Sequence, residues 1–380
     1  MATARLTINL CALQRNWQAL AAFSADATET AAVVKADGYG LDAARVSDAL
    51  NAVGVQSFFV ATAEEGAVVR KALSSVTIYV FSGYMENDAA IYAANNLIPL
   101  LNSPKQLQAW QSDMGNQPFA LQLDTGMNRL GFEPDEFSEV TTTARLSKLL
   151  ISHLACSEQP QHPQNEQQLR CFREMTDSLA AGGVPRSLAA TGGTLLGKDY
   201  HFDMVRPGIG LYGGLPFAKA EPVVTLSLPV IQTRTVKTGE TVGYGGCWQA
   251  SRETTVATLS AGYADGIIRA IGEQTTGKSV SLYSGTTPCP QIGRVSMDLL
   301  TVDISALQET PTELELINPL QGVDVLAAAA GTIGYEILTA LGGRYKRVYT
   351  NNDKGVIAKF DNAGRGVQPV SVGENIESPG

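Results

Sequence analysis

Between residues 31 and 212, short runs of β-branched or apolar residues alternate with stretches of helical periodicity. This alternation is typical of a parallel sheet built from β-α units. It predicts eight strands, within residues 31–35, 57–61, 77–81, 97–101, 119–124, 149–153, 187–191 and 203–212. It also predicts intervening helices, among them 42–53, 64–73, 104–112 and 164–181. Eight strands at this spacing favour a TIM-like (β/α)8 barrel over an open doubly wound sheet.

After about residue 222 the pattern changes to strands and turns. Strands are predicted over residues 223–228, 230–236, 255–260, 279–283, 299–304 and 323–327, with one helix near 334–341. A chain of 380 residues is long enough for two domains. We therefore predict a barrel domain over residues 1–222 and a second, mainly β domain over 223–380, with Pro222 near the boundary.

The composition excludes several classes of function. The net charge of −9 argues against a nucleic acid or an anionic membrane as partner, because both attract clustered Lys and Arg. The N-terminus lacks a secretory signal, and no run of about 18 apolar residues could span a bilayer. The five cysteines form no C-x-x-C pair, and the three histidines are scattered, so we expect reduced thiols, a cytoplasmic protein and no metal site.

The strongest local signal is Lys35, which ends a buried-looking strand and precedes a glycine turn in AVVKADGYG. One interpretation is a lysine that extends past the strand end to solvent. The other is an amine whose pKa is lowered by its surroundings and which forms a Schiff base with an aldehyde cofactor. Position alone does not separate the two.

Further polar residues fall at the same predicted end of the barrel. Active sites of such barrels lie at the carboxyl ends of the strands. His153 taken alone would more often be a structural histidine, but its place beside Lys35 in a closed barrel favours an active site. The residues predicted at this end also include Asp124, Arg129, Thr191 and Arg206.

The segment from Gly208 to Gly213 matches G-x-G-x-x-G but lies in the wrong context for a dinucleotide site. That fingerprint needs a helix opening on the glycines, and here a Gly-Leu-Pro sequence follows instead. Backbone amides beside a phosphate stay open as an alternative. Tyrosines among glycines in the second half of the chain are more often packing residues than functional ones.

Eight segments together resemble, in order, those of the alanine racemases, which are fold-type III pyridoxal-phosphate enzymes with a barrel and a β domain. The resemblance extends from Lys35 to about Tyr335 and rests on AVVKADGYG, DTGMNRLG, SHLA, VRPGIGLYGG, VGYGG, AGYADG, GRVSMD and TIGYE. It implies a homodimer in which Lys35 holds pyridoxal 5'-phosphate and acts as acid or base on one face of the substrate's Cα. Tyr244 of the partner subunit would serve the opposite face, as inversion of a stereocentre requires.

The resemblance also assigns supporting roles. His153 would hydrogen-bond Tyr244 of the partner subunit, and Arg206 would contact both His153 and the pyridine nitrogen. An arginine there is a permanent donor, which weakens the electron sink of the cofactor and suppresses side reactions. The cofactor phosphate would be bound by Tyr39, Thr191, Gly208, Ile209 and Tyr335. The substrate carboxylate would be bound by Arg129 and the backbone of Met297, with Asp298 adjacent, and the entry corridor would be lined by Tyr263, Arg269, Arg294 and Ile333.

Three motifs, with four residues in all, depart from the usual pattern of the family. Gln122 stands where many relatives carry a carboxylated lysine, and its neutral amide can accept a hydrogen bond from Arg129 without supplying charge. Ala190 and Thr191 replace an Asn-Ser pair, and Ser296 replaces a common cysteine.

The implied activity is that of a PLP-dependent alanine racemase, an isomerase that interconverts L- and D-alanine and supplies D-alanine for peptidoglycan. One alternative is a racemase for another small amino acid such as serine. A decarboxylase of the same barrel type would need an acidic group at the pyridine nitrogen, which Arg206 argues against. A non-enzymatic cofactor carrier, often a lone barrel, is disfavoured by the second domain and by Tyr244.

Overall fold

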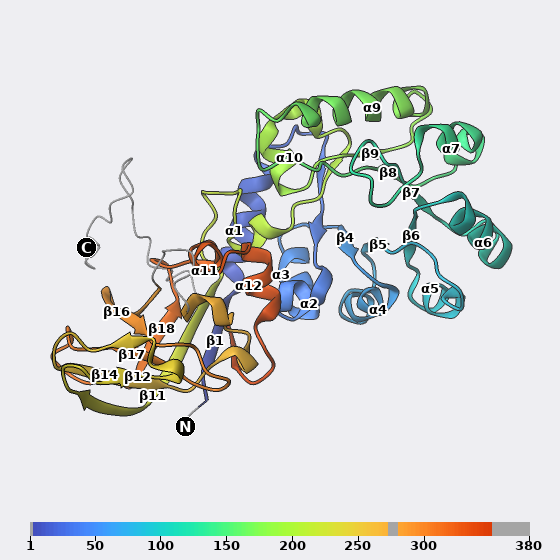
Figure 1. Ribbon diagram of the computed structural model, residues 1–380. Coiled ribbons are helices and arrows are strands. Elements are labelled where there is room, and N and C mark those ends of the chain that lie inside the picture. Colours follow the sequence, from blue (N-terminus) through green and yellow to red (C-terminus); the bar gives the residue numbers. More distant parts are fainter. Residues whose placement is uncertain (1–2, 273–279, 352–380) are drawn as a thin grey trace, which may run out of the picture.

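The structure is a computed structural model that describes residues 3–272 and 280–351. In Figure 1 a ring of strands surrounded by helices lies beside a separate group of antiparallel strands. Among the described residues, no single helix is long and apolar enough to cross a membrane, and only the bent pair of helices at 323–330 and 334–340 meets that criterion jointly.

The ring is a parallel β barrel. Seven strands pair in chain order: β3 (Ala32–Val33), β4 (Ser57–Val60), β5 (Thr77–Val80), β6 (Ile98–Leu101), β7 (Ala120–Gln122), β8 (Leu150–Ile151) and β9 (Arg186–Ser187). Strand β10 (Met204–Val205) pairs in parallel with β2 (Glu29–Thr30), which leads directly into β3. The amide of Arg206 donates to the Ala189 carbonyl at 2.8 Å, so β10 also joins the segment after β9. This closes the ring and confirms the predicted barrel.

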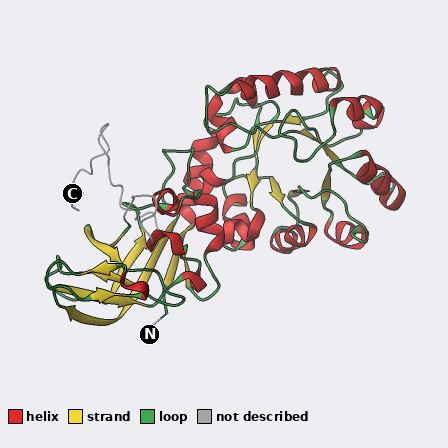
Figure 2. Ribbon diagram, viewed as in Figure 1, coloured by secondary structure: helices red, strands yellow, loops and turns green. Residues whose placement is uncertain are grey.

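Helices cover the outside of the barrel, as Figure 2 shows in red. Buried strands such as β4 (Ser57–Val60) are apolar on both faces because side chains fill the barrel and helices cover it. Local signals fix the helix starts: Thr62 caps α4 and Pro163 opens α9. The helices of this part are α1 (Leu10–Ala21), α3 (Ala43–Asn51), α4 (Ala63–Ala72), α5 (Ala89–Asn95), α6 (Pro104–Met114), α7 (Pro134–Glu139), α8 (Thr141–Ala144), α9 (Pro163–Ala180) and α10 (Thr191–Leu196).

The second half is built on one long strand, β11 (Val224–Val236), which pairs with strands on both sides. An irregularity between Val230 and Gln232 bends β11. Its first part therefore pairs with β18 and its last part with β14. The ring β14-β17-β16-β15-β18-β11 closes through this double pairing; its other members are β14 (Thr254–Leu259), β15 (Ser281–Ser284), β16 (Thr287–Ile292), β17 (Leu300–Asp303) and β18 (Glu313–Ile317). A short hairpin, β12 (Thr241–Val242) with β13 (Trp248–Gln249), packs against it through Val242 and Trp248.

The chain start belongs to this second sheet. Strand β1 (Arg5–Asn9) pairs antiparallel with β11, and β19 (Lys346–Thr350) pairs in parallel with β1. The boundary predicted at residue 222 stays a prediction, and residues 273–279 and 352–380 of the predicted second domain lie outside the described residues.

Two details of the predicted strands differ from the structure. The strand predicted over 323–327 is wrong, because this segment is helix α11 (Val323–Ala330). Its short apolar run carries four consecutive alanines, and periodicity alone does not distinguish such a run from a buried strand. The strands predicted over 223–228 and 230–236 are a single strand. Helix α12 (Gly334–Ala340) is confirmed.

Candidate active site

Lys35 lies directly after β3, at the carboxyl end of the barrel, and begins the turn α2 (Lys35–Gly40). Its side chain is reached by solvent, as the first interpretation of the sequence expected, and its Nζ lies 5.7 Å from the centre of the Phe81 ring. The surroundings nevertheless lower the pKa of the Lys35 amine. Desolvation is the largest cause, followed by the charge of Arg129, while Glu65 opposes them. A larger fraction of this amine is therefore neutral than in an ordinary lysine at the same pH.

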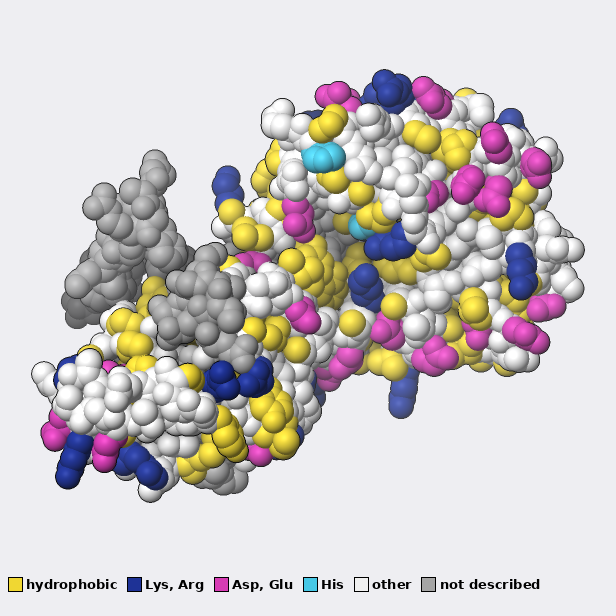
Figure 3. Space-filling model, viewed as in Figure 1, with side chains coloured by type: hydrophobic (Ala, Val, Ile, Leu, Met, Phe, Trp, Pro, Cys, Tyr) yellow, Lys and Arg dark blue, Asp and Glu magenta, His cyan; other side chains and the backbone are white. Residues whose placement is uncertain are grey.

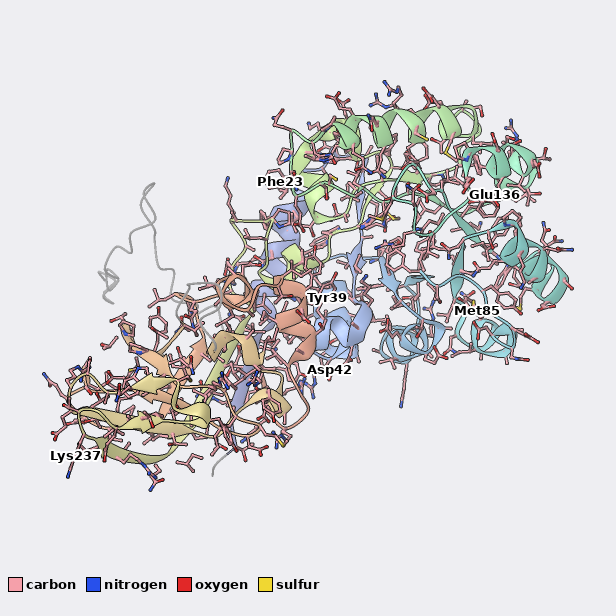
Figure 4. All side chains as sticks on the ribbon, viewed as in Figure 1. Phe23, Tyr39, Asp42, Met85, Glu136 and Lys237 are labelled. Atoms are coloured by element: carbon pink, nitrogen blue, oxygen red, sulfur yellow. The ribbon has the colours of Figure 1, made fainter. Side chains whose placement is uncertain are left out.

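The turn after Lys35 is left-handed. Residues 36–39 all have φ between 54° and 63°, although only Gly38 is a glycine. Such conformations are disfavoured for other residues and persist where the surrounding structure fixes them. Here the Asp37 carboxylate accepts the amide of Ala43 at 2.9 Å. As a result Tyr39 is buried where the barrel meets helix α12, as Figure 4 shows.

Arg206 is buried in the barrel interior, with 1% of its surface exposed. Its guanidinium donates to the Ser152 carbonyl at 2.7 Å and to the Ser187 hydroxyl. No carboxylate pairs with it among residues 3–272 and 280–351. Burial lowers the pKa of Arg206 to about 9, which leaves it charged at neutral pH. A buried cation without a counter-charge is costly, which favours a function for it.

His153 follows β8 and is a neutral imidazole at physiological pH. Burial first, and then the charges of Arg206, Arg129 and Lys35, lower the pKa of His153 to about 3. The four residues thus share one electrostatic environment at the carboxyl ends of different strands. Figure 3 shows Lys or Arg side chains and a histidine around a hollow in this face of the barrel.

Thr191, Gly208 and Tyr39 lie next to one another. The Thr191 hydroxyl accepts the amides of Gly208 and Gly210 at 3.0 and 3.3 Å. A Cβ on Gly208 would lie 2.4 Å from the Tyr39 hydroxyl, so only glycine fits there. The Tyr335 ring lies 6.1 Å from that of Tyr39.

These groups suit an anion. Burial raises the pKa of Tyr39, and it raises the pKa of Tyr335 to about 12, so both phenols stay protonated donors at neutral pH. Ile209 begins η2 (Ile209–Tyr212), a single short turn, which removes the dinucleotide interpretation of the glycine motif. Tyr39, Thr191 and Gly208, which are predicted to bind the phosphate, are therefore close together, and the Tyr335 ring lies near that of Tyr39.

The loop after β7 is organised by Asp124. One oxygen of its carboxylate accepts the amides of Gly126, Met127 and Asn128 at 2.8, 3.0 and 3.1 Å. Arg129 follows in the same loop and is exposed. Gln122 is buried and donates its Nε2 to the Leu130 carbonyl at 3.3 Å. The side chains of Gln122 and Arg129 are both described, and they form no hydrogen bond with each other.

The remaining predicted residues lie in loops and short turns of the second half of the chain, and most of them line one cavity. Tyr244 begins η3 (Tyr244–Gly246), after β12, and is 70% exposed; Met297 and Ile333 are also exposed. A cavity of about 460 Å³ is lined by Tyr244, Tyr263, Arg269, Arg294, Met297 and Asp298. Across the described part of the chain, no hydrogen bond or ion pair connects Tyr244, Met297 or Asp298 with Lys35. Two groups are thus formed, one on the barrel and one on the sheet.

Several contributing residues were missed from the sequence. Tyr212 stacks on Tyr39 with ring centres 4.3 Å apart, and Arg344 pairs with Asp265 and Asp298 at 2.7 and 2.8 Å. Tyr212 lies inside the VRPGIGLYGG motif, which was a usable signal. Nothing in the local sequence marks Arg344, because its partners are far away along the chain.

Comparisons with known proteins give the family. Residues 8–216 match the N-terminal domain of alanine racemase, and residues 223–349 match its C-terminal domain. An alanine racemase of Cereibacter sphaeroides is 56% identical over 352 residues, which cover 92% of this chain and 99% of the relative. One from Rhizobium meliloti is 40% identical, covering 92% and 97%.

Solved structures agree with this. The alanine racemase of Bartonella henselae, a crystal structure with covalently bound pyridoxal phosphate, superposes with a TM-score of 0.84 at 36% identity, covering 92% of this chain and all of that one. The biosynthetic alanine racemase of Pseudomonas aeruginosa gives 0.83 at 33% identity, with the same coverage. The relatives do not favour the serine alternative. The chain belongs to the alanine racemase family.

Proposed function

We propose that this protein is a pyridoxal-phosphate-dependent alanine racemase that interconverts L- and D-alanine. The observation that carries the proposal is the barrel mouth, where an amine of lowered pKa on Lys35 shares its surroundings with the buried cation of Arg206, which no carboxylate of the described residues pairs with. The site also fits the cofactor, because the missing Cβ of Gly208 leaves room beside the Tyr39 hydroxyl. Pyridoxal phosphate supplies an aldehyde and an electron-withdrawing ring that acidifies the Cα proton.

The residues of the chain then divide the work. Lys35 would bind the aldehyde and exchange a proton on one face of the Cα, and Tyr244 of the partner subunit would do so on the other. Arg206, as a donor-only group, would hold the ring nitrogen without protonating it. Neutral His153 would relay protons toward the phenol. Phosphate would bind to Tyr39, Thr191, Gly208, Ile209 and Tyr335, and the substrate carboxylate to Arg129 and Met297, with Asp298 adjacent.

We further propose a homodimer with shared active sites. Racemisation by two bases needs a phenol opposite Lys35, and the Tyr244 side chain is 70% exposed on the second sheet. Exposed apolar side chains surround it, including Met297 at 54% and Tyr263 at 42%. An exposed group of this kind is typical of a surface that is covered in an assembly. Residues 223–380 would then form the domain that delivers the second base to the barrel of residues 1–222.

Purified protein incubated separately with L- and D-alanine tests the activity. Optical rotation should decay to zero from both sides, and serine serves as the competing substrate. Borohydride treatment followed by peptide mass analysis should find the cofactor on Lys35. Tyr244→Phe should retain the cofactor and lose at least about a hundredfold in racemisation, since a general base contributes about that much. A Tyr244→Phe variant that racemises at the wild-type rate in both directions would contradict the two-base assignment.

The physiological role is proposed on the same basis. A cytoplasmic racemase of this kind would supply D-alanine for peptidoglycan. Deletion of the gene should then make growth depend on added D-alanine, and growth without it would contradict this role.

A further inference from the structure

Glu65 connects the ends of two neighbouring barrel strands. Its Oε1 accepts the amide of Ala36, after β3, and its Oε2 accepts the amide of Ala61, after β4; both distances are 2.7 Å. The carboxylate therefore lies beside the peptide that follows Lys35. No other side chain that the structure describes bonds to both of these strand ends.

An ordinary capping role does not explain this geometry. Thr62 is the N-cap of α4, and Glu65 is the third helical residue, so a capping box would direct the glutamate to the amide of Thr62 itself. The Thr62 hydroxyl does accept the Glu65 amide, at 3.4 Å. The carboxylate, however, reaches past Thr62 to Ala61 and across to Ala36. It serves the barrel mouth as well as its own helix.

The contact fixes the start of an unfavourable turn. Ala36 is the first of the four left-handed residues, at φ 54°. The far end of the turn is held by Asp37 and by Arg347, whose guanidinium donates to the Gly40 carbonyl at 3.0 Å. Lys35 comes immediately before the anchor at Ala36, and Tyr39 lies between that anchor and Gly40. Loss of the Glu65 anchor would let the chain relax toward commoner backbone angles.

The charge of Glu65 also acts on Lys35. The other charged or titratable groups that face this amine are Arg129 and, through His153, the buried Arg206. The charge of Arg129 disfavours a protonated Lys35, whereas the Glu65 carboxylate favours it. Glu65 thereby offsets part of a cationic environment.

We propose that Glu65 is a positioning residue that fixes the left-handed turn so that Lys35 and Tyr39 both face the cofactor, and that its negative charge tunes the Lys35 amine. The inference rests on the proposed function, since it concerns the binding of pyridoxal phosphate at Lys35. Glu65 itself touches backbone amides only.

The test compares three variants with the wild type. Glu65→Gln removes the charge and one of the two acceptors, because an amide nitrogen cannot accept a hydrogen bond. Glu65→Asp keeps the charge but shortens the side chain. Glu64→Gln is the matched control: it removes the same charge from the neighbouring residue, which is exposed and contacts neither strand end. Apoprotein of each is titrated with pyridoxal phosphate, and the rate of attachment to Lys35 is followed against pH.

We expect Glu65→Gln and Glu65→Asp to weaken binding of pyridoxal phosphate by about tenfold, or about 1.4 kcal/mol. The midpoint of the pH profile should move to lower pH in Glu65→Gln, because removal of a nearby anion favours the neutral amine. It should stay near the wild-type value in Glu65→Asp and Glu64→Gln. A general loss of folded structure would not shift the pH profile of Glu65→Gln while leaving that of Glu65→Asp unchanged.

Wild-type affinity and an unshifted profile in Glu65→Gln would overturn the inference. If Glu65→Gln does not fold, unchanged affinity in Glu65→Asp overturns it equally. A wild-type protein that attaches no pyridoxal phosphate to Lys35 would instead contradict the proposed function, and so the two failures are distinguishable.

Discussion

At the scale of single residues, close approach decides what can stand at position 208. A methyl group on Gly208 would lie 2.4 Å from the Tyr39 hydroxyl and would occupy the proposed phosphate site. Gly208→Ala should therefore weaken binding of pyridoxal phosphate by at least about tenfold, or about 1.4 kcal/mol. Equilibrium dialysis of the apoprotein measures this. Gly322→Ala is the control, because nothing lies within 4 Å of a Cβ added there; equal affinities in the two variants would refute the assignment.

The lowered pKa of His153 predicts that the stability of the folded protein depends on pH. The pKa of His153 is about 3 in the folded protein, against an ordinary value of 6.5, so between these values the unfolded chain binds the extra proton. Its contribution to stability is complete above pH 6.5 and is lost as pH falls toward 3, by at most about 1.4 kcal/mol per pH unit. Chemical denaturation of wild type and His153→Gln across this range should show a shallower loss in the variant. Parallel pH profiles would contradict the neutral imidazole of His153 in the folded protein.

At the scale of elements, the loop after β7 shows how one carboxylate shapes a binding segment. Asp124 accepts three successive amides, and the loop carries Arg129, the proposed carboxylate ligand. Asp124→Ala should raise KM for alanine by about tenfold, while binding of pyridoxal phosphate changes little, because the loop rather than the cofactor cradle loosens. Steady-state kinetics with cofactor titration separates the two. Asp124→Asn retains an acceptor oxygen and should recover most of the loss; no recovery would mean that the charge, not the loop geometry, matters.

At the scale of the whole molecule, the barrel group and the sheet group belong to different regions of one chain, and we propose that they meet between chains. Lys35→Ala and Tyr244→Phe should each be nearly inactive as homodimers. A heterodimer of the two, purified through two different tags, contains one intact site and should recover about half of the wild-type activity. The measurement is the initial rate of racemisation per dimer, compared between the heterodimer and the wild type. An inactive heterodimer would show that Lys35 and Tyr244 act within one chain.

The chain order of strands and helices was predictable because burial and turn residues follow a local pattern. The eight barrel strands, the helix that begins at Pro163, and the lysine at the first strand end could all be found in this way. The segment 323–327 was not, since its apolar run suits a strand or a helix equally until its neighbours are known. The roles of the site residues were inferred from resemblance to the family, whereas the distances and contacts of these residues could be obtained only from the structure.

The barrel, the β-rich second half and the family could be predicted from the amino-acid sequence, because each rests on residues adjacent or regularly spaced along the chain. Three features became visible only in the folded molecule: β1 joins the second sheet, residues 36–39 turn left-handed, and Glu65 binds two strand ends. The structure also shows that Tyr244 lies exposed on the sheet. These features depend on partners distant in sequence, and the chain alone does not say which distant groups will meet. Their contacts supply the free energy that holds backbone and charges in arrangements which local preference disfavours.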